Sequence, residues 1–395
     1  MSLRNQNGGF IRPGFDPLQV PNEPTSVAVT AGDTQLSVAF TAPANVGGGA
    51  ISTYQAATTT GISATASTSP VVITGLSNGT SYSVRVWAIN AYGPGPFGTG
   101  SGTPAAARGL FGGGFVGPVS NVIDYVNIST LSNATDFGDL TVQRYQLGAC
   151  ASTTRAVFGP GLLSPGYSNV MDYVTIASAG NAVDFGDFTF VTSGDAGCSS
   201  DTRGVFGGGQ EGGAISNPIT YITIATTGNG QDFGNLTVSR ERAGACSSAT
   251  RGVFGGGIAA GSSVLNVIDY ITIASIGNAT DFGDLTLSRY SLSACSSSTR
   301  GLFGGGLNSS FADTNVIDYI TIASTGNATD FGDLTAVAGG VAACSSATRG
   351  LFAGGPSNVI AYVTITSVGN AIDFGDLTVA RSELAGCSNA HGGLA

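Results

Sequence analysis

Short apolar segments alternate with glycine-rich and polar stretches along the whole chain. From residue 105 onward, Val, Ile, Tyr, Phe and Thr dominate these segments, as in GVF (252–254) and VIDYITI (267–273), and strands prefer these residues. The apolar positions show no sustained helical period, which would place them three or four residues apart. The pattern therefore predicts an all-β protein in which helices are nearly absent.

The segments belong to one unit that occurs six times. The tripeptide DFG marks each copy, and its aspartates are spaced 48, 48, 49, 49 and 43 residues apart. These aspartates are Asp136, Asp184, Asp232, Asp281, Asp330 and Asp373. One cysteine and one arginine per copy follow the same interval. The arginines are Arg108, Arg155, Arg203, Arg251, Arg300 and Arg349. Such a period indicates a repeat architecture.

Each unit offers four short β segments. In order within a blade, the first surrounds the cysteine, as in 293–299, and the second precedes a glycine run, as in 252–254. The third follows a variable loop, as in 267–273, and the fourth contains DFG, as in 279–287. Four strands per unit of this length are typical of one blade of a β-propeller. We therefore expect a six-bladed propeller over residues 105–395.

The unit resembles a kelch repeat. The glycine doublet of that family lies in 255–257, its tyrosine is Tyr270, its large aromatic residue is Phe282 and its downstream arginine is Arg289. The usual kelch tryptophan is phenylalanine in every copy, so the resemblance is to a divergent kelch-like set.

The two ends of this region predict how the propeller closes. It begins at ARGLFGGG (107–114), the segment before a glycine run, which stands second in a blade. It ends at LAGCSNAHGGLA (384–395), which contains a cysteine segment, the kind that stands first in a blade. Pairing the last segment with the first would complete one blade from both ends of the region and hide two sheet edges.

Residues 21–104 have a different pattern. The alternating segments 36–40 and 82–90 are typical of sandwich strands, and GLSNGTSY (75–82) predicts a tyrosine corner at Tyr82. The stretch resembles a fibronectin type III domain. The familiar positions are Pro24, Tyr54, Leu76, Tyr82, Ala88, Asn90 and Gly93. Phe40 replaces the core tryptophan of that family, and the direction of Trp87 stays open.

Residues 1–20 form a third part, rich in Gly, Asn and Pro, which suggests an extended arm. It is either a frayed terminus or an anchor on a partner, with Phe10, Ile11 and Phe15 as apolar contacts. Its start lacks the apolar run of a Sec signal peptide.

The DFG aspartates invite a metal or kinase interpretation. The chain has no lysine for the phosphates of a kinase substrate, and no enzyme needs six copies of one metal ligand. Asp281 and Asp284 could hold calcium, yet Asp beside Gly more often caps a turn. We also consider that the repeated aspartates pair with the repeated arginines. Replacing Arg251 by a neutral residue and measuring the melting temperature would test this pairing.

Other chemistry is poorly supported. His391 is the sole histidine, so no catalytic triad or zinc site is expected, and no cofactor is implied. One cysteine per blade predicts a small buried residue on the inner strand, too far from its equivalents for disulfides. That fits assembly in a reducing cytoplasm.

Charge and hydropathy limit the partners. The net charge is −10 without a basic cluster, which argues against nucleic acid, and no apolar run is long enough to span a membrane. The loops after the glycine runs vary most between copies, as expected of a binding face. Tyr167, Gln210, Glu211 and Phe311 are candidate contacts there, and the alternative is that these loops are ordinary surface turns without a partner. The connections 143–149 and 239–245 form a second candidate surface.

Near-identical repeats, low charge and a fibronectin-type partner resemble virion proteins of tailed phages, especially marine and cyanobacterial ones. The resemblance implies a non-enzymatic tail or fibre protein in the virion, present in several copies and bound to other virion proteins. Its propeller would contact a host-surface glycan or protein. The alternatives are a capsid decoration protein, a secreted adhesin and a glycan-active propeller enzyme.

Overall fold

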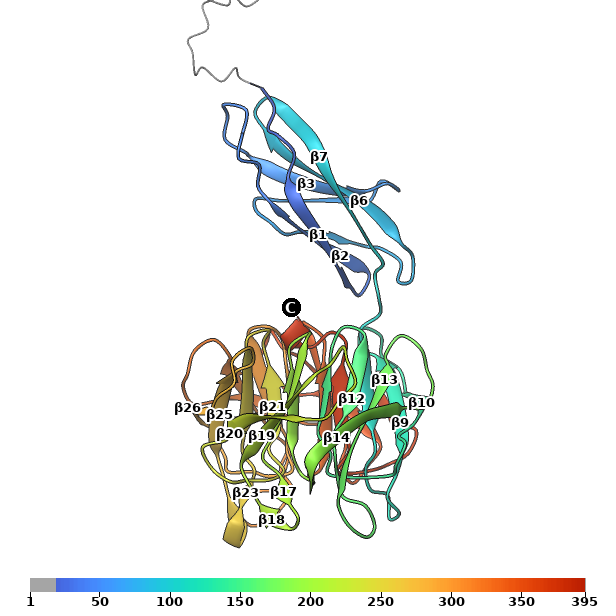
Figure 1. The fold of residues 1–395 in the computed structure, drawn as a ribbon, viewed down its shortest axis with the longest axis vertical. Coiled ribbons are helices and arrows are strands. Elements are labelled where there is room, and N and C mark those ends of the chain that lie inside the picture. Colours follow the sequence, from blue (N-terminus) through green and yellow to red (C-terminus); the bar gives the residue numbers. More distant parts are fainter. Residues whose placement is uncertain (1–18, 395) are drawn as a thin grey trace, which may run out of the picture. The chain divides into compact units, whose positions relative to one another are not determined.

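The computed structural model describes residues 19–394. The chain forms two compact units that divide between Ala106 and Ala107 (Figure 1), close to the expected boundary at residue 105. Phe10, Ile11 and Phe15 lie outside the described residues. Strands make up nearly all of the regular structure, so the predicted all-β class is confirmed.

The first unit is a sandwich of two antiparallel sheets. One sheet contains β1 (Thr25–Gly32), β2 (Gln35–Thr41) and β5 (Val71–Thr74). The other contains β4 (Ser63–Ala66), β3 (Thr53–Thr58), β6 (Tyr82–Asn90) and β7 (Gly93–Gly102). Alternate residues of β2 and β6 are buried, as the period of two requires. Phe40 fills the core and packs on Tyr54, with ring centroids 4.7 Å apart.

Polar side chains fix two corners of this sandwich. The Ser77 amide donates to the Tyr82 hydroxyl at 3.1 Å, which confirms the predicted tyrosine corner. Asn90 is buried and its amide donates to the carbonyl oxygens of Gln19 and Val46. Trp87 points away from the core, where it packs edge-on against Phe97.

The second unit contains six four-stranded antiparallel sheets (Figure 1), numbered here from the one that includes β8. Sheet 1 contains β35 (Ala385–Ser388), β8 (Arg108–Gly112), β9 (Val122–Asn127) and β10 (Thr135–Asp139). Sheet 2 contains β11 (Ala149–Ala151), β12 (Arg155–Phe158), β13 (Ser168–Thr175) and β14 (Val183–Thr192). Sheet 3 contains β15 (Ala196–Ser199), β16 (Arg203–Gly207), β19 (Pro218–Thr223) and β20 (Gln231–Asn235).

The remaining three sheets repeat this plan. Sheet 4 contains β21 (Gly244–Ser247), β22 (Arg251–Gly255), β25 (Val267–Thr272) and β26 (Thr280–Asp284). Sheet 5 contains β27 (Ser293–Ser296), β28 (Arg300–Gly304), β29 (Val316–Thr321) and β30 (Thr329–Asp333). Sheet 6 contains β31 (Val341–Ser345), β32 (Arg349–Gly354), β33 (Val359–Thr364) and β34 (Ile372–Asp376).

Minor elements occupy the loops and the last turn. They are the ribbons β17 (Gln210–Glu211) with β18 (Ala214–Ile215) and β23 (Ile258–Ala259) with β24 (Ser263–Val264), and the 3₁₀ turns η1 (Ala260–Ser262) and η2 (Gly392–Leu394).

Sheet 1 is assembled from both ends of the unit. Strand β35 pairs antiparallel with β8, with Ala385 opposite Gly112 and Ser388 opposite Gly109. The predicted pairing of the last segment with the first is therefore present. The first strand of each sheet also contacts the first strand of the next, and β35 contacts β11.

Cysteines and glycines form a second contact, between the first strand of one sheet and the second strand of the next. All six cysteines are free, buried and located on the first strand of a sheet, as predicted. The Cys198 thiol faces Gly252 of the next sheet, where a Cβ atom would lie only 2.9 Å from the sulfur. Burial raises the pKa of the Cys198 thiol to about 12, so its reactive thiolate is scarce.

The repeated arginines link neighbouring sheets. Arg251 stacks on Tyr270 of its own sheet, 4.3 Å from the ring centroid, and its Nη1 donates to the Ile322 carbonyl of the next sheet at 2.7 Å. All six arginines make both contacts, and Arg349 returns to Ile128 of sheet 1. The hypothesis that these arginines pair with the DFG aspartates is wrong, because every ion pair found within residues 19–394 uses other groups.

The DFG tripeptide is architectural. Phe282 is buried and meets Tyr270 edge-on, whereas Asp281 is exposed. Gly283 forms a β-bulge with φ of 144°, and a Cβ atom there would lie 2.6 Å from the Gly326 carbonyl of the next sheet. The Asn327 side chain accepts from the amide that follows this bulge, at 3.1 Å.

This asparagine contact recurs between all six pairs of neighbouring sheets, so asparagine is the repeated cap at this turn. Only Asp184 among the DFG aspartates is seen to cap its own turn, by accepting from the Gly186 amide at 3.3 Å.

A second arginine set forms fully buried ion pairs. Arg240, in the connection that leads into sheet 4, lies 2.9 Å from Asp269 of β25, and neither side chain reaches solvent. Equivalent pairs are Arg144–Asp172, Arg289–Asp318 and Arg381–Asp124. Sheets 3 and 6 lack both partners, with threonine at 192 and 220 and alanine at 338 and 361. An unpaired buried charge is costly, so a sheet without the arginine is expected to lack the aspartate as well.

We predict that Arg240→Thr alone destabilises the chain by about 3–5 kcal/mol, because it leaves Asp269 buried without a cation. The double variant Arg240→Thr/Asp269→Thr, which copies sheet 3, should recover part of this loss. Chemical denaturation followed by fluorescence gives both free energies of unfolding.

Arg251→Thr serves as the matched control, because it removes a half-buried arginine with no carboxylate partner. It should cost about 1–2 kcal/mol, the value of a carbonyl hydrogen bond and a cation–π contact. A double variant no more stable than Arg240→Thr would contradict the pairing argument.

Candidate functional site

The connections between successive sheets meet in a ring of backbone hydrogen bonds. One residue per connection contributes, four positions before each cysteine. These residues, called the axial ring here, are Gln146, Gly194, Arg242, Ser291, Gly340 and Glu383. The amide of each donates to the carbonyl of the preceding one at 2.7–2.9 Å, and Gln146 donates to Glu383. The six bonds form a complete cycle.

The ring imposes a left-handed backbone on all of its members. Their φ angles run from 51° at Ser291 to 73° at Gly194. Glycine adopts this conformation freely, but an L side chain pays for it, at roughly 1 kcal/mol per residue. Only two ring positions are glycine, so four keep a side chain despite the strain. Strained backbone of this kind clusters at functional sites.

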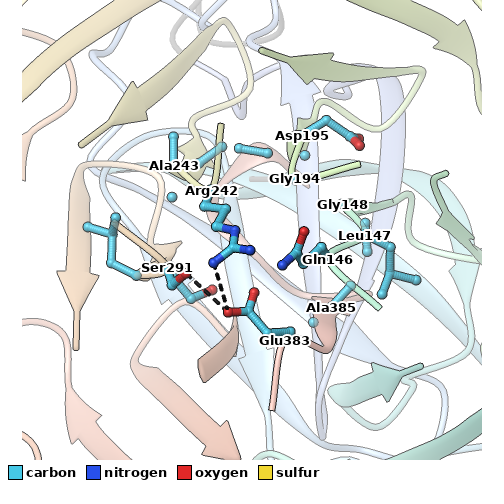
Figure 2. Close-up of a pocket in the computed structure, with 18 of the residues that line it drawn as sticks. Gln146, Leu147, Gly148, Gly194, Asp195, Arg242, Ala243, Ser291, Glu383 and Ala385 are labelled. Atoms are coloured by element: carbon cyan, nitrogen blue, oxygen red, sulfur yellow. Dashed lines mark hydrogen bonds and ion pairs between the residues drawn. The ribbon is translucent and has the colours of Figure 1, made fainter. Parts of the chain in front are cut away.

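These side chains line a depression of about 80 Å³ (Figure 2). Arg242 Nη1 lies 3.8 Å from Glu383 Oε1, and the Ser291 hydroxyl donates to the same oxygen at 3.1 Å. Gln146 lies against the guanidinium and can present its amide oxygen to it. Arg242 and Glu383 remain 28% and 21% exposed, so a ligand can reach both charges.

Asp195 adds a buried carboxyl to the wall of the depression. The equivalent position is apolar in the other five connections. Neither oxygen has a hydrogen-bond partner among the described residues. Burial raises the pKa of Asp195 from 3.8 to about 7, and its own backbone and Arg144 offset only part of that rise. The carboxyl is therefore partly protonated near neutral pH.

The opposite ends of the same strands carry His391. Its Nδ1 accepts from the Gly393 amide at 3.1 Å, and its Nε2 lies 3.0 Å from the Ala151 carbonyl. This pattern fits a neutral imidazole with the proton on Nε2, and desolvation lowers the pKa of His391. The chain end lies here, away from β17, β18 and β23 (Figure 1).

The two candidate surfaces expected from sequence form a single face. The loops after the glycine runs pair with the sheet connections through bridges such as Glu241–Ile258 and Tyr290–Leu307. Among the predicted contacts, the Tyr167 hydroxyl donates to Gln210 Oε1 at 2.8 Å. Glu211 and Phe311 are exposed. The sequence did not predict the axial ring residue by residue, because two copies have glycine at this position and the other four have Gln, Arg, Ser and Glu.

Comparison with known families identifies the first unit. A model described as Fibronectin type III domain matches residues 22–101, which therefore form such a domain. No curated protein matches the chain.

Residues 19–394 contain no group of three or more His, Cys, Asp or Glu side chains placed to hold a metal ion. The described part of the chain also has no helix long and apolar enough to cross a membrane.

We predict that Arg242→Gly leaves stability nearly unchanged. Glycine adopts the left-handed backbone without strain, which is a gain in stability. Two losses oppose it, the larger conformational entropy that glycine loses on folding and the weak, partly exposed ion pair with Glu383. Each of the three terms is about 1 kcal/mol or less, so they should nearly cancel. Thermal unfolding measures the change, with Arg251→Gly as the control that should destabilise. A marked loss of stability in Arg242→Gly would assign the side chain a structural role.

Asp195→Asn should stabilise the chain increasingly as the pH rises from about 4 to about 7. Over that range the folded state holds a proton that the unfolded state has released, so the wild-type free energy of unfolding falls with rising pH. The gain is at most about 4 kcal/mol. Urea denaturation of both chains at pH 4.5 and 7.5 tests this. An equal effect of the substitution at the two pH values would show that the pKa of the Asp195 carboxyl is not raised.

Proposed function

We propose that the six sheets constitute a six-bladed, kelch-like β-propeller closed by β35, carried by a non-enzymatic virion protein of the tail or fibre type. The contacts that recur between neighbouring sheets, including those between sheet 6 and sheet 1, support this assignment. The kelch-like order of glycine run, tyrosine, aromatic residue and arginine supports it as well.

One observation carries the proposal of a binding role. Positions that differ between the repeats gather on one face, formed by the axial ring and the loops after the glycine runs. Positions that stay the same lie inside and between the sheets. A constant frame that presents different side chains on one face is suited to recognising a partner.

The chemistry of the face favours binding over catalysis. Arg242 and Glu383 are engaged with each other, and His391 lies at the other end of the strands with both nitrogens engaged. The Ser291 hydroxyl does donate to Glu383, but this carboxylate also pairs with Arg242, so it is held in an ion pair and is not a free base for covalent catalysis. We therefore propose a host-surface glycan or protein as the partner of this face.

The remaining parts would attach the propeller to the particle. The fibronectin type III domain is a compact module of the kind used as spacer or adhesion unit, and residues 1–20 precede it. In this proposal several copies bind other virion proteins through these parts, after assembly in the host cytoplasm. Nucleic acid is not a proposed partner, given the net charge of −10.

Cryo-electron microscopy of purified source particles tests this function. We expect six-bladed discs at the tail or its fibres, and immunogold labelling against the chain at the same place. Discs spread over the head lattice would make the chain a capsid decoration protein. Particles without the disc or the label would overturn the virion assignment.

A further inference from the structure

Phe311 is presented to solvent at a cost. It lies at the tip of the loop between β28 and β29, is 53% exposed and has a φ of 60°. Both an exposed phenyl ring and a left-handed non-glycine residue are unfavourable in isolation. The loop is nevertheless ordered, because the Asn308 side chain accepts from the amides of Ser310 and Ala312 at 2.8 and 3.2 Å.

Phe311 is coupled to the axial ring through Tyr290. The two rings meet edge-on, with centroids 6.1 Å apart and an angle of 75°. Two backbone hydrogen bonds between Tyr290 and Leu307 fix the loop to the connection, and Ser291 of the axial ring follows directly. An exposed aromatic surface therefore adjoins the polar depression.

Charged groups surround this aromatic pair. Arg242, Glu383 and Asp313 all act electrostatically on the Tyr290 hydroxyl, whose pKa burial raises. Glu383 already accepts from Ser291, and its exposed fraction leaves it open to a further donor. Asp313 is exposed on the same loop as Phe311. The site thus joins one apolar platform to several acceptors and one guanidinium donor.

We propose that this site, formed by Phe311, Tyr290, Asp313, Ser291, Arg242 and Glu383, binds a neutral or amino hexopyranose of a surface glycan. Such a sugar has an apolar C–H face, which matches the phenyl ring, and a rim of hydroxyls, which matches the carboxylates and the guanidinium. Two acids against one arginine, in a chain of net charge −10, disfavour an acidic sugar. The inference rests on the proposed binding function and names its ligand class.

A related pair lies elsewhere on the same face. Phe115, 41% exposed, packs on Tyr145 with centroids 5.4 Å apart, and Tyr145 precedes Gln146 of the axial ring. An aromatic loop residue resting on the tyrosine before a ring position therefore occurs twice. We assign the primary site to Phe311, because its tyrosine directly precedes Ser291, whose hydroxyl donates to Glu383 beside Arg242.

The test uses the full chain and the methyl glycosides of glucose, galactose, mannose, N-acetylglucosamine and glucosamine, with N-acetylneuraminic acid as an acidic probe. Saturation-transfer NMR and titration calorimetry report binding. We expect at least one neutral or amino glycoside to bind. Phe311→Ala and Glu383→Gln should each weaken it about tenfold, the loss expected for one stacking contact or one hydrogen bond to a charged group. Phe311→Tyr should keep it.

Ile276→Ala is the matched control, since Ile276 is 61% exposed and lies in the turn between β25 and β26, at the other end of the strands. It should leave binding unchanged. Thermal unfolding of Phe311→Ala should match that of wild type, because the side chain is exposed. Binding of no glycoside, preference for the acidic probe, or binding that survives Phe311→Ala would each overturn the proposal.

The outcome separates this site from the wider function. A chain found on virus particles that binds no glycoside would keep the proposed function and lose the glycan site. Phe311-dependent binding by a chain absent from particles would keep the glycan site and remove the virion assignment.

Discussion

Neighbouring sheets of the second unit approach one another closely at two levels of the interface, and glycine supplies the room at both. At the first level, Gly252 of β22 faces the Cys198 thiol of the preceding sheet, and five of the six sheets have glycine at this position while sheet 2 has Ala156. At the last strands, the bulged Gly283 meets the backbone of Gly326. Across the same interface, Arg251 reaches a carbonyl and Asn327 an amide. The glycine of each DFG follows from the close approach at the last strands.

Because these contacts hold the six sheets together, positions outside the packed interfaces can carry different side chains in different copies. The axial ring satisfies its backbone groups with each other, so the cycle persists whether a position holds Gly194 or Arg242. The buried ion pairs vary under a stricter rule, because arginine and aspartate are present or absent together. Exposed positions of the ring and loops therefore diverge one residue at a time, whereas buried charges diverge in pairs.

Repetition explains how much of the fold could be predicted from sequence. Six copies of one pattern located the strands, the inner cysteines and the partner of residues 385–388. Family matching independently supports the first domain. The buried partner of Asp269 was missed, since Arg251 is the more conspicuous repeated arginine. The sequence did contain a signal for this pair. The two copies that lack the arginine, at positions 192 and 338, also lack the aspartate, at positions 220 and 361. The ring could not be predicted, because Gln, Arg, Ser and Glu are not residues that favour a left-handed backbone.

The pairing of β35 with β8 joins residues that are separated by nearly the whole second unit. During synthesis, β8, β9 and β10 are the first strands of this unit to emerge, and their sheet is complete only when residue 388 has been added. Five sheets can form in order, yet the interface on either side of sheet 1 stays open until synthesis reaches this strand. A chain cut short before this strand leaves the edge of β8 unpaired and removes the neighbour that β11 and β31 share, so it exposes backbone groups that can pair with other chains.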